Sequence, residues 1–180
     1  MKVLILGASG FIGNATALAF VRAGHIVYGQ TRSSTTAKKL AADEIIPVVC
    51  DPHTEEGKAT WGKIASQADV GMFPALLRRP LLIQQVVCDI LKTSGPANAL
   101  ATFHHFVDLV GKRPRATPKA TYIYTGGLWS LSRGVGGLET WTDERQPRTE
   151  YNEAVGWRAE VEDPVLLGKK RPPIRPRNLS

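Results

Sequence analysis

Residues 7 to 13 form the segment of the sequence whose residue types are best suited to bind an anion. They are Gly7, Ala8, Ser9, Gly10, Phe11, Ile12 and Gly13. The first glycine permits a tight turn, the second lets a ligand approach the backbone, and the third allows a helix to pack closely on a strand. A helix that begins within the segment would direct free N–H groups and a partial positive charge at the ligand. The segment therefore predicts a pyrophosphate site in which all seven residues contact a dinucleotide. In the alternative interpretation, the glycines only shape a tight turn.

Three later residues bear on the identity of that dinucleotide. Arg32 follows a predicted strand at the place where an NAD site carries an acidic residue, and its guanidinium suits the 2′-phosphate of NADP. Ser33 beside it offers a hydroxyl as a further donor, so NADP is predicted over NAD. The alternative is that Arg32 is a solvated loop residue. Asp51 is placed either to accept a hydrogen bond from the adenine amino group or to form a turn before Pro52.

The glycine-rich segment lies at the start of a regular alternation of strands and helices. Short apolar or β-branched runs predict strands at 2–6, 25–31 and 44–50. Stretches with helical spacing or helix stop signals predict helices at 11–23, 34–42 and 55–66. Such alternation is typical of a parallel sheet with right-handed crossovers and helices on both faces. The predicted fold class is α/β, a doubly wound parallel sheet in three αβα layers.

Beyond residue 66 the pattern is weaker but continues. The predicted elements are a fourth strand at 68–73, a helix at 80–95, a second helix that ends at Gly111, a fifth strand at 120–125 and a last helix within 153–168. Two helices are thus expected between the fourth and fifth strands, the first of them begun by Pro80. Pro164 is expected to kink or end the last helix.

Composition and cysteine usage narrow the class of protein. The 180 residues are 43% apolar, enough for one domain with a substantial core. The two cysteines are too few and too far apart for a disulfide framework or a zinc cluster, so a cytoplasmic location and no metal site are predicted. Glycines interrupt the most apolar stretch, 3–21, so no membrane span is predicted, and a secretory signal is the weaker interpretation.

The net charge of +7 is concentrated at the C-terminal end of the sequence. Five basic residues lie in the last twelve positions: Lys169, Lys170, Arg171, Arg175 and Arg177. They leave a charge of only +2 on residues 1–168. The basic character therefore belongs to a proline-rich tail, and no nucleic-acid partner is predicted.

Four features together resemble a known family. They are the Gly-x-x-Gly-x-x-Gly segment, Arg32, Asp51 and the run Tyr122-Ile123-Tyr124-Thr125-Gly126-Gly127 at the fifth strand. In these features residues 1–168 resemble the extended and atypical short-chain dehydrogenase/reductases, the group that contains NAD-dependent epimerase/dehydratases and nitrogen-metabolite-repressor-like proteins. The resemblance implies an NAD(P)-binding Rossmann domain over 1–168, and Arg32 favours NADP over NAD. Residues 169–180 are then either a basic tail or the start of a sixth strand.

The resemblance also implies catalytic residues, which this sequence supplies only in part. The family uses a Ser or Thr after strand five, then a Tyr followed four residues later by a Lys that lowers the pKa of the phenol. Thr125 supplies the hydroxyl, which would also contact the cofactor, and Tyr151 lies at a suitable distance, but Val155 stands at the lysine position. In a second register, Arg158 takes the lysine position and Ala154 that of the tyrosine.

Two functions of different classes follow from these features. One is an NADP-dependent oxidoreductase or epimerase/dehydratase that acts on a small molecule. The other is a non-catalytic regulator that senses NADP and binds a protein partner, which the incomplete Tyr and Lys pair favours. A truncated, inactive relative is a third alternative, because the family's C-terminal substrate lobe is expected to be absent or truncated. A homodimer is compatible with each of these functions.

Overall fold

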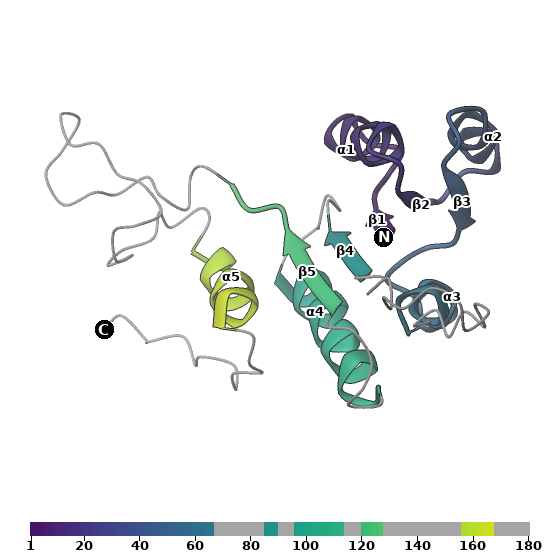
Figure 1. Cartoon of the computed structure of the whole chain (residues 1–180). Helices are drawn as coiled ribbons and strands as arrows, with labels where there is room; N and C mark the ends of the chain where they lie inside the picture. The colour runs from purple at the N-terminus through teal and green to yellow at the C-terminus, as the bar shows by residue number, and fades with distance from the viewer. Residues whose placement is uncertain (67–84, 90–95, 114–119, 128–155, 168–180) are drawn as a thin grey trace, which may run out of the picture.

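The structure is a computed structural model that describes residues 1–66, 85–89, 96–113, 120–127 and 156–167 (Figure 1). The strands in these ranges are β1 Lys2–Leu6, β2 Ile26–Thr31, β3 Ile46–Val49, β4 Gln85–Asp89 and β5 Ala120–Tyr124. The helices in the same ranges are α1 Phe11–Arg22, α2 Ser34–Ala42, α3 Glu55–Ser66, α4 Pro96–Gly111 and α5 Arg158–Leu167.

The strands form one parallel sheet in the order β3-β2-β1-β4-β5. The chain leaves β3 at one side of the sheet, passes through α3 and enters β4 beside β1, so the strand order reverses between β1 and β4. In doubly wound sheets, ligands bind outside the carboxyl ends of the strands at such a reversal. Leu6 pairs with Asp89, and Asp89 pairs with Tyr124, so β1, β4 and β5 end at one edge.

Helices cover both faces of the sheet (Figure 1). Because side chains alternate along a strand, β1 contributes Val3 and Ile5 to one core and Leu4 and Leu6 to the other. The first core is closed by Ala17 and Leu18 of α1 and Leu40 of α2, and the second by Trp61 and Ala65 of α3 and Phe106 of α4. This arrangement confirms the doubly wound, three-layer α/β fold. None of the helices in the described ranges is long and apolar enough to cross a membrane.

Over residues 1–66, every predicted element is present within two residues of its predicted ends. β1, α2 and α3 match their predicted bounds. Gly24 ends α1 with a φ of +76°, a conformation that favours glycine. The Ser33 side chain caps α2 by accepting a hydrogen bond from the Thr36 N–H at 3.3 Å. Strong stop and capping signals therefore explain the accuracy in this part of the chain.

The prediction is wrong at the fourth strand. Residues 85–89 form β4, where a helix was expected, and only α4 lies between β4 and β5 in the described ranges. A strand buried on both faces carries a continuous apolar run, which spacing alone does not distinguish from a buried helix. The strand predicted at 68–73 falls outside the described residues. α5 continues past Pro164 to Leu167, so the proline does not end the helix.

Candidate functional site

The glycine-rich loop connects β1 to α1 at the carboxyl edge of the sheet. Gly7 has a φ of +80°, in the left-handed region that favours glycine. Its carbonyl oxygen accepts a hydrogen bond from the Gly10 N–H at 3.0 Å, which closes a tight turn. Gly10 then caps α1 without a side-chain hydrogen bond. The loop therefore turns the chain sharply from the strand into the helix, as the glycine spacing predicts.

Gly13 lets α1 pack directly on that turn. A Cβ at position 13 would lie 2.1 Å from the carbonyl oxygen of Gly7 and 2.8 Å from its carbonyl carbon. No side chain fits at these distances, so the third glycine is required by the close approach of helix and turn. The packing role that the sequence assigns to Gly13 is confirmed.

The first turn of α1 offers backbone N–H groups to a ligand. The first helical hydrogen bond runs from the Asn14 N–H to the Gly10 carbonyl at 2.9 Å, so the amides of Phe11, Ile12 and Gly13 precede it. The first turn contains no acidic residue. Phe11 is 98% exposed and Ile12 is 52% exposed. These three amides, at the positive end of the helix dipole, can therefore bind a diphosphate.

Gln30, at the end of β2, holds the loop in position. Its side-chain Oε1 accepts a hydrogen bond from the Gly7 N–H at 2.9 Å, and its backbone carbonyl accepts one from the Ala8 N–H at 3.1 Å. Its Nε2 donates to the Cys50 carbonyl at 2.7 Å. This buried side chain thus links the ends of β1, β2 and β3. Sequence reasoning gave Gln30 no role, although an amide within an apolar strand signals a need for buried partners.

Arg32 and Ser33 follow β2 at the same edge of the sheet. β2 pairs with β1 in parallel, with Gly29 opposite Ile5, so Arg32 lies just past the level at which β1 ends. Arg32 is exposed. Ser33 has a structural role as the cap of α2, but its hydroxyl can still donate its own hydrogen to a ligand. The structure therefore places both residues at the same edge of the sheet as the glycine-rich loop.

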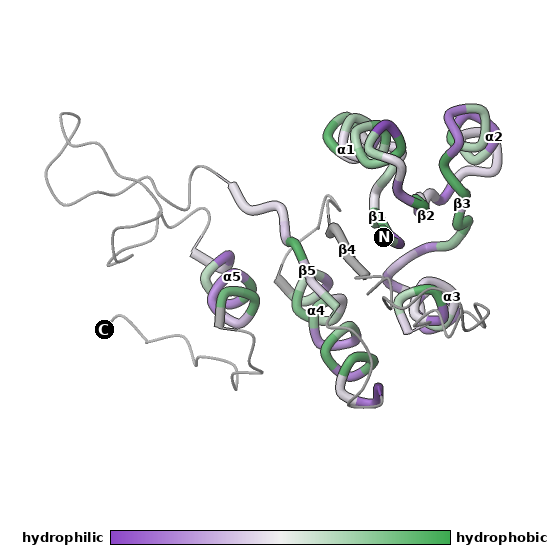
Figure 2. Tube along the Cα trace, in the orientation of Figure 1, coloured by the Kyte–Doolittle hydropathy of each residue, from purple (hydrophilic) through white to green (hydrophobic). Residues whose placement is uncertain are grey.

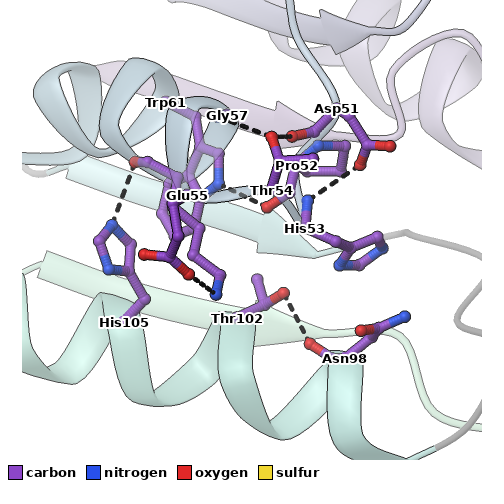
Figure 3. Close-up of polar contacts among 11 residues, drawn as sticks. Asp51, Pro52, His53, Thr54, Glu55, Gly57, Trp61, Asn98, Thr102 and His105 are labelled. Atoms are coloured by element: carbon purple, nitrogen blue, oxygen red, sulfur yellow. Dashed lines mark hydrogen bonds and ion pairs between the residues drawn. The ribbon is translucent and has the colours of Figure 1, made fainter.

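Asp51 forms the turn between β3 and α3, a connection that is hydrophilic (Figure 2). Its Oδ1 accepts a hydrogen bond from the His53 N–H at 3.1 Å, and its carbonyl oxygen accepts one from the Thr54 hydroxyl at 3.1 Å (Figure 3). The turn-forming interpretation of Asp51 is thus confirmed. The His53 N–H uses only Oδ1 of the carboxylate. A hydrogen bond from the adenine amino group to the second carboxylate oxygen therefore stays a prediction.

Cys50 precedes Asp51 and packs against the second core. Burial, and to a smaller extent the charge of Asp51, raise the pKa of the Cys50 thiol. The thiol is therefore protonated at neutral pH, which disfavours a nucleophilic role. Within the described ranges, no group of three or more His, Cys, Asp or Glu side chains could hold a metal ion.

The predicted catalytic residues are placed only in part. Thr125 is exposed and directly follows β5 at the carboxyl edge, whereas Tyr151 lies outside the described residues. Arg158 of α5 lies against the backbone of Gly127, with its Cζ 3.1 Å from the position of a Cβ there. α5 therefore brings Arg158, which takes the lysine position in the second alignment with the family, to the segment that follows β5.

Comparisons with known proteins find solved structures that are similar to part of this chain at low sequence identity. No protein-family model matches the sequence, and no curated protein matches it. A crystal structure of a protein from Lactobacillus casei is 22% identical, covers 73% of this chain and has a TM-score of 0.48. A nucleoside-diphosphate-sugar epimerase from Pseudomonas aeruginosa is 22% identical over 77% of the chain, with a TM-score of 0.47. An isoflavone reductase is 18% identical over 73% of the chain, with a TM-score of 0.46. This chain spans 50%, 37% and 38% of their respective lengths.

Proposed function

We propose that this chain is an NADP-binding domain whose glycine-rich loop, residues 7–13, holds the diphosphate of the cofactor. The observation that carries the proposal is the contact of Gly13 with Gly7, where a Cβ would lie 2.1 Å from the carbonyl oxygen. That contact fixes the first turn of α1 over the end of β1. It thereby sets the N–H groups of Phe11, Ile12 and Gly13 at the reversal of strand order, where doubly wound sheets bind their ligands.

The residues present fit a dinucleotide along its length. The α1 amides would receive the diphosphate, and the exposed Ser9 hydroxyl lies in the same loop as a further donor. Asp51 would accept a hydrogen bond from the adenine amino group with the carboxylate oxygen that the turn leaves over. Thr125, at the end of β5, would contact the opposite end of the cofactor. Bound NADPH supplies a hydride donor, and the protein's contribution is to hold and orient it.

The preference for NADP over NAD rests on Arg32. A guanidinium binds phosphate oxygens with paired donors, whereas it offers less to the ribose hydroxyls of NAD. Ser33 and the N-terminal end of α2 would add a hydroxyl donor and backbone N–H groups beside it. This edge of the sheet therefore suits a phosphate on the adenosine ribose.

The Arg32→Asp variant tests both parts of the proposal. We expect calorimetry to show NADPH binding to the wild type and about 10- to 100-fold weaker binding to the variant, because a charge-assisted contact becomes a repulsive one. NADH affinity should stay equal or rise. Arg22→Asp makes the same charge change in the last turn of α1 and should leave both affinities unchanged. Equal NADPH affinity in wild type and Arg32→Asp would remove the NADP assignment, and no binding of either cofactor to the wild type would remove the proposed function.

For the reaction class, an NADP-dependent oxidoreductase or epimerase/dehydratase acting on a small molecule is proposed. The second candidate is an NADP-sensing regulator in a cytoplasmic setting, either as a homodimer or with a protein partner. One observation favours the second candidate, since α5 brings Arg158 to the end of β5 and arginine does not tune its proton as lysine does. NADPH consumption across aldehydes, ketones and sugar nucleotides distinguishes the two. Turnover supports an enzyme, and binding without turnover supports a regulator.

A further inference from the structure

The segment after β5 carries a second group of residues suited to bind an anion. α5 contacts β5 and α4, and it lies beside β5 in Figure 1. Arg158, the first residue of α5, lies against Gly127, where its Nε and Nη1 are each 3.4 Å from the position of a Cβ. Glu162, one turn later, lies against Gly126, with its Oε1 2.9 Å from the corresponding position. The two glycines thus let an arginine and a glutamate approach the main chain.

The Arg158 guanidinium contacts Glu162 and Trp157 without a hydrogen bond to either residue. Its Nη1 lies 4.0 Å from Glu162 Oε1, well beyond the approximately 2.7–2.9 Å of a charge-assisted hydrogen bond. Its Cζ lies 5.0 Å from the centre of the Trp157 ring, a cation–π contact. In the part of the chain that the structure describes, none of its N–H groups makes a hydrogen bond. The Arg158 side chain is 24% exposed, so a ligand can reach it.

Glu162 positions this guanidinium without saturating it. Its side chain is only 8% exposed, and a buried carboxylate beside a cation keeps that cation in a defined position. A guanidinium presents five donors in a fixed, planar fork that matches the oxygens of a carboxylate or a phosphate. The pair therefore leaves an arginine that is oriented and still able to bind an oxyanion.

The position of this arginine in the fold separates it from the glycine-rich loop. β5 pairs with β4, and β4 pairs with β1, so the carboxyl ends of β5 and β1 lie two strands apart at one edge. With about 4.8 Å between neighbouring strands, these ends are about 10 Å apart. An anion at Arg158 would thus lie beside a dinucleotide bound at the loop, at the same edge of the sheet.

We propose that Arg158, the backbone of Gly127 and the Thr125 hydroxyl form a second anion site, with Gly126 between them as a neighbouring reporter. The site takes the carboxylate or phosphate group of a small-molecule ligand that binds beside the cofactor. Thr125 is exposed, and the group nearest to the position of a Cβ at Gly127 is the Arg158 guanidinium itself, so the cation lies directly against this main chain. The inference rests on the proposed function only for the neighbouring cofactor, because the chemistry of the site belongs to Thr125, Gly127 and Arg158.

The test is a residue-resolved anion titration of the ¹⁵N-labelled full chain by NMR. Inorganic phosphate and malonate are titrated separately, and the amide signals of Gly126 and Gly127 are followed. Both signals should shift with at least one anion, and the anion that binds more tightly identifies the ligand class. Arg158→Gln should weaken that binding at least about tenfold, because a charged hydrogen-bond donor is lost. Arg22→Gln, which removes a charge from the last turn of α1, should not change it.

A double variant keeps the test valid if the single variant does not fold. Arg158→Gln leaves Glu162 buried without its cation, so Arg158→Gln with Glu162→Gln removes both charges and should lose the anion response while keeping the remaining spectrum. Absence of shifts at Gly126 and Gly127 up to saturating anion, or shifts that persist in both variants, would overturn the inference.

A parallel NADPH titration is read at Gly7, Gly10 and Gly13. A protein that binds NADPH at these glycines but no anion at Gly126 and Gly127 retains the proposed function and loses this inference. A protein that binds an anion at Gly126 and Gly127 but shows no NADPH response at the loop retains this inference and loses the proposed function. The two proposals therefore fail separately.

Discussion

Replacing Gly13 with alanine is expected to lower the affinity for NADPH by about 100-fold or more. The new Cβ would lie 2.1 Å from the Gly7 carbonyl oxygen, so α1 must move away or the turn must open. Either movement displaces the amides of Phe11 and Ile12, which the proposal assigns to the diphosphate. A 100-fold loss corresponds to about 2.7 kcal/mol, the size of one or two hydrogen bonds to a charged group. Isothermal titration calorimetry measures it directly.

Two further glycines provide matched controls for this variant. A Cβ at Gly10 would lie 3.3 Å from the Gly7 carbonyl oxygen, so Gly10→Ala should cause a smaller loss of affinity than Gly13→Ala. A Cβ at Gly111 has no neighbour within 4 Å, so Gly111→Ala should bind NADPH as the wild type does. If Gly13→Ala bound NADPH with unchanged affinity, the first turn of α1 would not be the diphosphate site.

The Gly57→Ala variant should lower the free energy of unfolding by about 3 kcal/mol or more. A Cβ at position 57 would lie 1.6 Å from the Asp51 carbonyl oxygen and 2.6 Å from its carbonyl carbon. The Gly57 N–H donates to the Thr54 hydroxyl oxygen at 3.0 Å, so α3 cannot move away without losing its cap (Figure 3). The clash can therefore be relieved only if the turn after β3 and the start of α3 move apart, which weakens the packing between them. Urea denaturation measures the change.

Gly111→Ala also serves as the control for stability, since it makes the same substitution at the end of α4 in open space. Its free energy of unfolding should differ from that of the wild type by about 1 kcal/mol at most. Wild-type stability of Gly57→Ala would show that α3 does not pack on the Asp51 carbonyl as described.

How far the fold could be predicted depended on how local the signal is. α2 and α3 match their predicted ends because the cap of Ser33 and the turn at Asp51 act within a few residues. β4 was mistaken for a helix because its short apolar run fits either element, and only the assembled sheet shows that it pairs with β1 and β5. The long-range pairing of strands, rather than local preference, decided that segment.

The candidate site shows the same division. The glycines of the loop could be identified because the residue type itself signals a turn or a close approach, as Gly7 and Gly13 demonstrate. The partners of Gln30 could not be identified, because they depend on the ends of three strands meeting around one side chain. The approach of Arg158 to Gly127 likewise requires that α5 return to the end of β5. Tertiary contacts of this kind produce no recognisable spacing of residues in the sequence.

A crystal structure of the protein with NADPH tests the central claim most directly. We predict that the diphosphate oxygens lie within hydrogen-bond distance of the N–H groups of Phe11, Ile12 and Gly13, with the adenosine 2′-phosphate beside Arg32. NADPH bound elsewhere on the protein, or a glycine-rich loop without ligand at saturating NADPH, would contradict the account.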